Sequence, residues 1–215
     1  MTISAPRLSA MTSTVRNPAI TSVIENSLRL VERWVEAHDY RGHAPFLGLT
    51  SPLRRLTHGN LLLDRLLMQL IRQSPVNLRP LFGVRPLEST KGRGYMASGY
   101  LMRLMQTGDP SYERKARQCL DWLMEHRSRR YAQFSWGNYF DFASRAGRYS
   151  KDEPIIVWTA IIGQAFLDGF ELLHDQKYLD VATSVCEWIL ALPRQTTSSG
   201  SCLSYLACKG SFVHN

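Results

Sequence analysis

The chain has 215 residues, of which 44% are hydrophobic and 20% are charged. This composition is typical of a folded domain and excludes a chain that is disordered throughout. The formal charge of +8 raises the question of nucleic-acid binding. The arginines lie in small separate clusters, however, and the sequence has neither zinc-finger spacing nor an RNP-like aromatic pattern. We therefore expect no nucleic acid as a partner.

The cysteine pattern argues against disulfides and metal. The four cysteines are Cys119, Cys186, Cys202 and Cys208, and none of them forms a CxxC pair. The first two fall within apolar helical patterns. The sequence thus predicts no metal site and favours a reducing, cytoplasmic compartment. No apolar run approaches the ~20 residues that span a bilayer, so we expect a soluble protein with no membrane partner.

The first residues of the chain are rich in Ser and Thr, and the first acid is Glu25. A transit peptide shares these features, but two arginines are few for one and the apolar residues are scattered. We expect residues 1–17 to be a disordered tail that runs into a helix.

Helix signals divide the remaining sequence. Asn17-Pro18 offers an N-cap and a first-turn proline for a helix to about Ala37. A leucine-rich stretch predicts a second helix over 60–73, which Ser74-Pro75 ends.

Four more helices are expected further along the chain. They cover about 93–106, a segment that starts at Asp109-Pro110, about 154–173, and about 176–191. No run argues for a β-strand, so the sequence predicts an all-α fold.

A repeat lies inside this helical pattern. The segment DPSYERKARQCLDWL (109–123) matches DQKYLDVATSVCEWI (175–189), so that Trp122 corresponds to Trp188. The loops that follow match as well, with Tyr139 on Tyr205. We interpret 94–205 as two copies of one helical hairpin, within a domain over 18–215. Such hairpins must stack, because neither copy buries its apolar face alone.

The connections between the predicted helices alternate in length. The turn inside each hairpin is short, whereas the segments after the hairpins, 128–153 and 192–215, are long. Short turns therefore gather on one rim of the stack and long loops on the other. We expect a binding site on the long-loop rim.

Four segments resemble an α/α-toroid family of polysaccharide biosynthesis loci, related in fold to six-hairpin glycosidases. They are DYRGHAPFLGLTSP (39–52), SWGNYFDFASRAG (135–147), PIIVWTAIIGQAFLDGFE (154–171) and CLSYLACKGSFVHN (202–215). The resemblance covers roughly 28–215 and implies stacked antiparallel hairpins forming part of an (α/α) toroid. Members often carry the label δ-aminolevulinic acid dehydratase, which does not suit this chain, because that enzyme is a β/α barrel.

The chain departs from the family pattern in two ways. Ala44 and Leu47 stand where the family usually has two aspartates. The length also supplies only about half of the hairpins that close such a ring. We therefore expect an inactive N-terminal fragment, with an open toroid edge through which copies can self-associate.

The resemblance implies sugar chemistry on the long-loop rim. Glycoside cleavage usually uses two carboxylates, whereas lyase or epimerase chemistry on uronic acids uses a base, a proton donor and a cation. Asp141 is the acidic candidate and Tyr139 the proton donor, while Trp136 can stack on a sugar ring and Arg145 can pair with a uronate. The alternative is structural: Asp141 pairs with Arg145, and Trp136 plugs the base of the hairpin.

Further candidates follow from the resemblance alone. It places Asp39 and His43 in a polar loop on the working rim, and Tyr205 in the family's end motif with His214. The run Lys91-Gly92-Arg93-Gly94 lacks the spacing of a phosphate loop, and we interpret it as a turn and helix start.

Two hypotheses remain open from the sequence. The first is a carbohydrate-active toroid protein, glycosidase-, lyase- or epimerase-like, that acts on a carbohydrate substrate without a cofactor. The second is a non-catalytic toroid that binds a glycan or a protein partner.

Overall fold

The computed structural model describes residues 18–145 and 147–207. Its contacts divide the chain at Asp39 into two units, which are treated separately. In the first unit, α1 (Pro18–Ala37) forms where the sequence predicts a helix. Most of its apolar side chains are exposed, Trp34 among them at 52%. The Trp34 ring stacks on His38, with 4.3 Å between the centroids.

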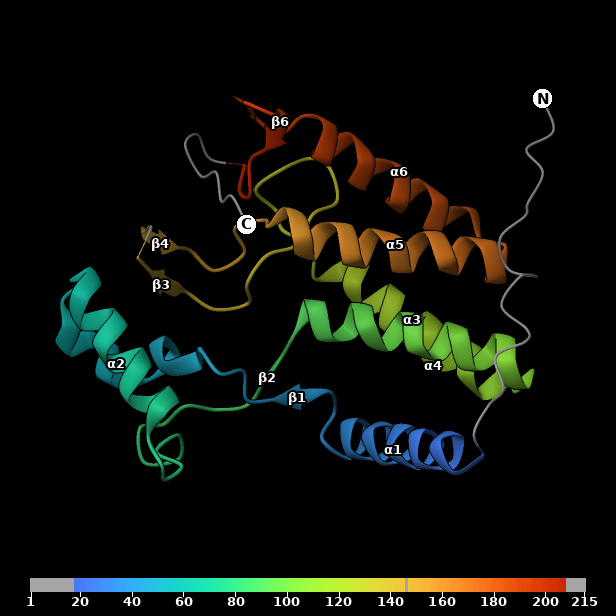
Figure 1. The fold of residues 1–215 in the computed structure, drawn as a ribbon, viewed down its shortest axis with the longest axis horizontal. Helices are drawn as coiled ribbons and strands as arrows, with labels where there is room; N and C mark the ends of the chain where they lie inside the picture. Colours follow the sequence, from blue (N-terminus) through green and yellow to red (C-terminus); the bar gives the residue numbers. More distant parts are fainter. Residues whose placement is uncertain (1–17, 146, 208–215) are drawn as a thin grey trace. The chain divides into compact units, whose positions relative to one another are not determined.

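The second unit begins at Tyr40 and is mostly helical, in agreement with the predicted fold class (Figure 1). Two short 3₁₀ helices, which the sequence analysis did not predict, cover Leu47–Thr50 and Pro52–Thr57. The α-helices lie close to their expected bounds and are α2 (Leu61–Gln73), α3 (Thr90–Thr107), α4 (Pro110–Glu125), α5 (Ile156–Leu173) and α6 (Gln176–Leu190).

Helices α3 to α6 form two hairpins with matching bounds. Helix α5 starts and ends 66 residues after α3 (from 90 to 156 and from 107 to 173). Helix α3 packs on α4, α5 packs on α6, and the two hairpins meet through α3 and α5. The first helices of the two copies, α3 and α5, lie side by side and begin at the same end of the stack (Figure 1).

The short turns of both hairpins use the same local chemistry. Gly108 and His174 end α3 and α5 in the left-handed conformation, with φ of 68° and 52°. Asp109 and Asp175 then cap α4 and α6 by accepting from the backbone N–H two residues later. Both aspartates therefore act as helix N-caps.

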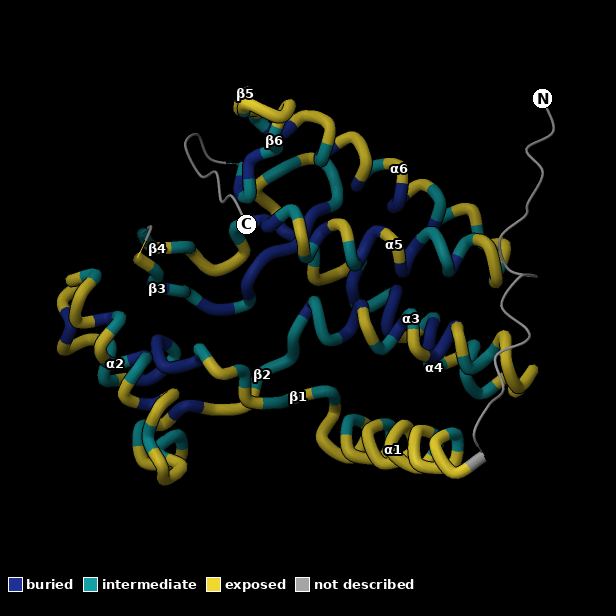
Figure 2. The backbone as a smooth tube through the Cα atoms, viewed as in Figure 1, coloured by how far each residue is buried: buried dark blue, intermediate teal, exposed yellow. Residues whose placement is uncertain are grey.

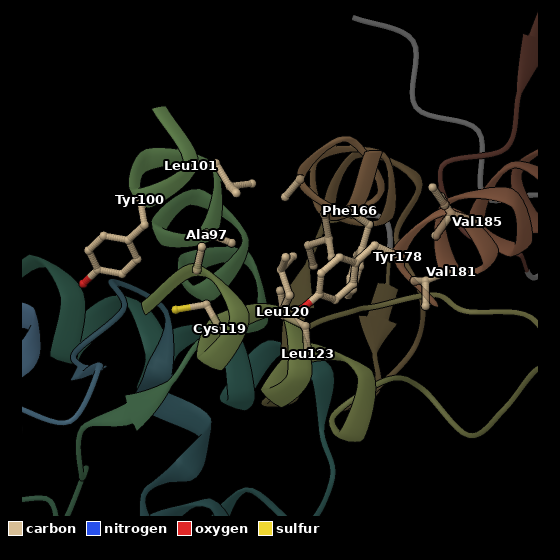
Figure 3. Packing of buried hydrophobic residues seen from close by; sticks show 14 of the residues in the cluster. Ala97, Tyr100, Leu101, Cys119, Leu120, Leu123, Phe166, Tyr178, Val181 and Val185 are labelled. Atoms are coloured by element: carbon tan, nitrogen blue, oxygen red, sulfur yellow. The ribbon is translucent and has the colours of Figure 1, made fainter. Parts of the chain in front are cut away.

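The main core lies between the facing sides of these four helices (Figures 2 and 3). Leu120 and Leu123 of α4 meet Phe166 of α5, and Tyr178 of α6 adds its ring 5.9 Å from that of Phe166. Trp188 is buried, as expected for a core residue, whereas its counterpart Trp122 is only half-buried.

Helix α5 packs against α3, α4 and α6. Two glycines permit this: a Cβ on Gly163 would lie 2.6 Å from Val185 Cγ1, and one on Gly169 would lie 2.8 Å from Leu120 Cδ1. Within the described part of the chain, α5 is also the one helix long and apolar enough to cross a membrane, by length and composition alone. Its central position in the core accounts for that composition equally well.

The expectation of no β-strand is wrong in detail. Three short antiparallel ladders occur, in which β1 (Arg41–Gly42) pairs with β2 (Leu87–Glu88), β3 (Phe142–Ser144) with β4 (Gly147–Tyr149), and β5 (Arg194–Thr197) with β6 (Gly200–Leu203). Each strand has two to four residues, too few for hydrophobic alternation to be visible in the sequence.

A matched pair of substitutions tests the packing of α5. We expect Gly163→Ala to lower the free energy of unfolding by about 1–3 kcal/mol, because the new methyl group must displace Val185. Gly99→Ala is the control within α3, where a Cβ meets no atom within 4 Å. It should be neutral or stabilise by up to about 1 kcal/mol. Urea unfolding of both variants measures the difference, and equal effects would contradict the close contact.

Candidate functional site

The loop after α4 is anchored by Trp136. Its indole is 0% exposed, stacks against Phe166 with 5.7 Å between the centroids, and donates from Nε1 to the Leu123 carbonyl at 2.9 Å. Its backbone N–H donates to Thr159 Oγ1 at 3.0 Å. Trp136 thus links the loop both to α4, which precedes it, and to α5, which follows it.

The next residue lets the loop cross itself. Gly137 forms an antiparallel bridge with Pro154, and a Cβ at Gly137 would lie 1.8 Å from the Glu153 carbonyl oxygen. Only glycine fits this approach of two backbones. The crossing fixes where the chain leaves the core, and so places Tyr139 on the long-loop rim.

A pocket of about 410 Å³ opens there, at the starts of α3 and α5. We call it the tyrosine pocket. Aromatic rings make up more than half of its lining residues: Phe46, Tyr139, Phe140, Phe142, Tyr149, Trp158 and Tyr205. Tyr139 and Tyr205 are the counterparts predicted from the repeat, so both copies contribute a phenol to one wall.

Lys91 supplies the charge in the tyrosine pocket. Its ammonium lies 5.7 Å from the ring centroids of Tyr95 and Trp158. Ser89 and Asn138 add polar groups, and no Asp or Glu is among the described residues that line the pocket. The wall therefore combines flat apolar surfaces, hydrogen-bonding groups and one cation.

Both tyrosines of the repeat are held in the neutral form. Burial raises the pKa of Tyr139, although a hydrogen bond with Ser89 opposes the shift. Burial also raises the pKa of Tyr205, with a smaller effect from Tyr149. At neutral pH each phenol can donate a proton or a hydrogen bond, but neither supplies a base.

A second, more open hollow of about 860 Å³ lies next to the tyrosine pocket, and Tyr139 lines both. We call it the basic groove, after its cationic lining residues Arg41, Arg85, Arg127, Arg129 and Lys151. Its lining acids are Glu88, Glu125 and Asp152.

Asp141 lines neither hollow. It forms an ion pair with Arg54 and accepts from the Lys151 backbone N–H at 2.6 Å. Burial acts to raise its pKa, but these two partners outweigh it and hold the pKa of Asp141 below its ordinary value. The expected structural role is present, but the partner is Arg54 in the second 3₁₀ helix rather than Arg145.

The other predicted site residues lie in different parts of the structure. Trp136 is buried and cannot stack on a sugar ring, and Arg145 is exposed in the β3–β4 turn away from both hollows. His43 is exposed and lies just before the pocket residue Ala44, while Asp39 belongs to the first unit. His214 lies outside the described residues. Of the predicted residues that the structure describes, only Tyr139 and Tyr205 line the pocket.

Most of the pocket lining was not predicted from the sequence, Trp158 and Lys91 included, and neither was one buried ion pair. Trp158 was assigned to an apolar helix and Lys91 to a helix start; both assignments hold, and both side chains also reach the pocket. Asp64 of α2 is 0% exposed and pairs with Arg148 of β4, 84 residues away. No local pattern signals a contact of that separation.

The described residues contain no group of three His, Cys, Asp or Glu side chains that could hold a metal ion. Comparison with known families found no family model that matches the chain, and comparison with curated proteins found no match. The toroid resemblance therefore rests on the motifs quoted above.

The ion pair of Asp141 yields a prediction about stability. We expect Asp141→Asn to lower the free energy of unfolding at neutral pH by about 1–2 kcal/mol, because it breaks a partly buried charged hydrogen bond. Arg145→Ala is the control and should have little effect, since its side chain is exposed.

The sign of the pH dependence follows from the lowered pKa. The carboxylate of Asp141 stabilises the fold above its ordinary pKa of 3.8, and this contribution is lost as the pH falls through the lower folded value. The difference between wild type and Asp141→Asn should therefore shrink below about pH 4. A constant difference in urea unfolding across that range would contradict the assignment.

Proposed function

We propose that this chain is a carbohydrate-active protein of polysaccharide metabolism, built as part of an α/α toroid, and that the tyrosine pocket holds a sugar ring. The observation that carries the proposal is the aromatic wall to which both copies of the repeat contribute, through Tyr139 and Tyr205. The alignment of α3 with α5, side by side and starting at one end, supports the toroid.

The lining of the pocket suits a saccharide. The C–H faces of a sugar ring pack on flat aromatic surfaces, while its hydroxyls need hydrogen-bonding groups. Ser89, Asn138 and the tyrosine phenols are such groups. The volume lies within the range of about 300–1,000 Å³ that is usual for small-molecule sites.

The ammonium of Lys91 favours a ligand that carries a negative charge. An ammonium beside a sugar-sized pocket can pair with the carboxylate of a uronic acid. The two α-helices that begin at the pocket, α3 and α5, add the positive ends of their dipoles. A uronic acid is therefore the sugar class that this pocket fits best.

The chemistry of the described lining favours binding over hydrolysis. Cleavage by a carboxylate pair needs two acids beside the ligand, and Asp141 is engaged with Arg54 instead. Tyr139 can donate a proton, which leaves a lyase- or epimerase-like step dependent on a base supplied from elsewhere. The non-catalytic alternative, a toroid that binds a glycan in the cytoplasm, thus gains support.

A protein partner, or a second copy of this chain, is the other candidate ligand. Helix α2 exposes a row of leucines, with Leu62, Leu66 and Leu70 at 59%, 57% and 55%. A row of this kind is a candidate contact surface. It suits the open-edge self-association proposed for a partial toroid.

Titration with galacturonic acid, with galactose as the neutral comparison, tests the proposed function. We expect wild type to prefer galacturonic acid, and Trp158→Ala to weaken that binding by about tenfold or more through loss of its ring. Trp34→Ala is the matched control, because Trp34 does not line the pocket. Calorimetry measures both, and equal binding by Trp158→Ala and wild type would refute the assignment.

A further inference from the structure

We infer that the basic groove binds a chain of acidic sugars that continues from the tyrosine pocket, so that the two hollows form one path for an acidic polysaccharide. The inference rests on the proposed function for the ring inside the pocket. It adds a second binding surface and the chemical class of the polymer.

The two hollows are adjacent. Tyr139 lines both, and the segment from β2 into α3 alternates between them: Glu88 and Thr90 face the groove, whereas Ser89 faces the pocket. A chain that leaves the pocket past Tyr139 enters the groove directly. This adjacency suits one polymer that occupies both hollows, whereas two separate ligands would not need the hollows to adjoin.

The cations of the groove come from four places in the sequence. Arg41 belongs to β1, Arg85 precedes β2, Arg127 and Arg129 follow α4, and Lys151 precedes α5. Folding gathers them around one hollow, although the sequence shows only small scattered clusters. Their summed field attracts a polyanion.

Several of these cations are free to bind a ligand. The side chains of Arg41, Arg85 and Lys151 are exposed and form no ion pair within the described part of the chain. Arg127, in contrast, is held in place by donating from Nη1 to the Ala132 carbonyl at 2.7 Å. A guanidinium can bind a carboxylate through two parallel hydrogen bonds, which suits uronate groups spaced along a polymer.

The groove fits an acidic glycan better than a nucleic acid. Glu88, Glu125 and Asp152 lie among the cations, where they can accept hydrogen bonds from the hydroxyls of a sugar chain. Trp122, which lines the groove together with Tyr139, already stacks on His126 at 3.8 Å and has Arg93 over its ring at 5.0 Å. The Trp122 ring is therefore not available to stack on a nucleic-acid base, a contact that supports binding of single strands.

The test compares binding of fluorescently labelled oligogalacturonates of increasing length to the full chain. Affinity should rise with length and fall with added salt, because the added rings meet the cations of the groove. Maltooligosaccharides of equal length should show neither effect. Arg41→Gln with Arg85→Gln should weaken binding of the long oligogalacturonate by about tenfold and leave galacturonic acid binding unchanged.

A matched double variant controls for net charge. Arg114→Gln with Arg145→Gln removes two exposed arginines that line neither hollow, and should leave binding intact. Equal weakening by the two double variants, no gain of affinity with length, or equal affinity for oligothymidylate of the same charge would each overturn the inference.

The failures of the two proposals are distinguishable. Binding that depends on Trp158 but not on Arg41 and Arg85 overturns the groove and leaves the proposed function standing. Binding that depends on the two arginines but not on Trp158 overturns the pocket as a sugar site, and with it the continuous path.

Discussion

The crossing of two backbones at Gly137 determines where the tyrosine pocket and the basic groove lie. Trp136 fastens the long loop to α4 through Leu123 and to α5 through Thr159, and the absence of a side chain at Gly137 lets the returning strand pass at Glu153. The chain therefore emerges from the core in one direction. Tyr139, which separates the tyrosine pocket from the basic groove, owes its position to that exit.

The second copy of the hairpin adds Tyr205 to the tyrosine pocket. Because the hairpins α3–α4 and α5–α6 stack through their first helices, equivalent loops lie on the same rim. Tyr139 and Tyr205 reach one pocket for this reason, and an antiparallel bridge between Ile155 and Leu206 joins the two loops. The copies also differ within these loops, since residues 194–203 form the β5–β6 ladder whereas the equivalent residues 128–137 belong to no named strand.

Local signals made the helices predictable. Caps such as Asp109 and Asp175 act within a few residues, so the bounds of α4 and α6 could be predicted closely from the sequence. The site was less predictable, because its contacts span long separations. Asp141 has a nearby arginine at Arg145 but pairs with Arg54, 87 residues away. Trp136 has the composition of a sugar-stacking residue, yet its burial depends on core partners that only the fold brings together.

Helix α5 has a role beyond packing. It contacts both helices of the first hairpin as well as α6, so neither hairpin completes its core without it. The four helices should accordingly fold as one cooperative unit, although the repeat suggests two. Amide hydrogens of α5 would then exchange with solvent only on global unfolding, whereas the exposed loops of the rim exchange through local opening. The rim around the tyrosine pocket can thus adjust its shape while the helix behind it stays fixed.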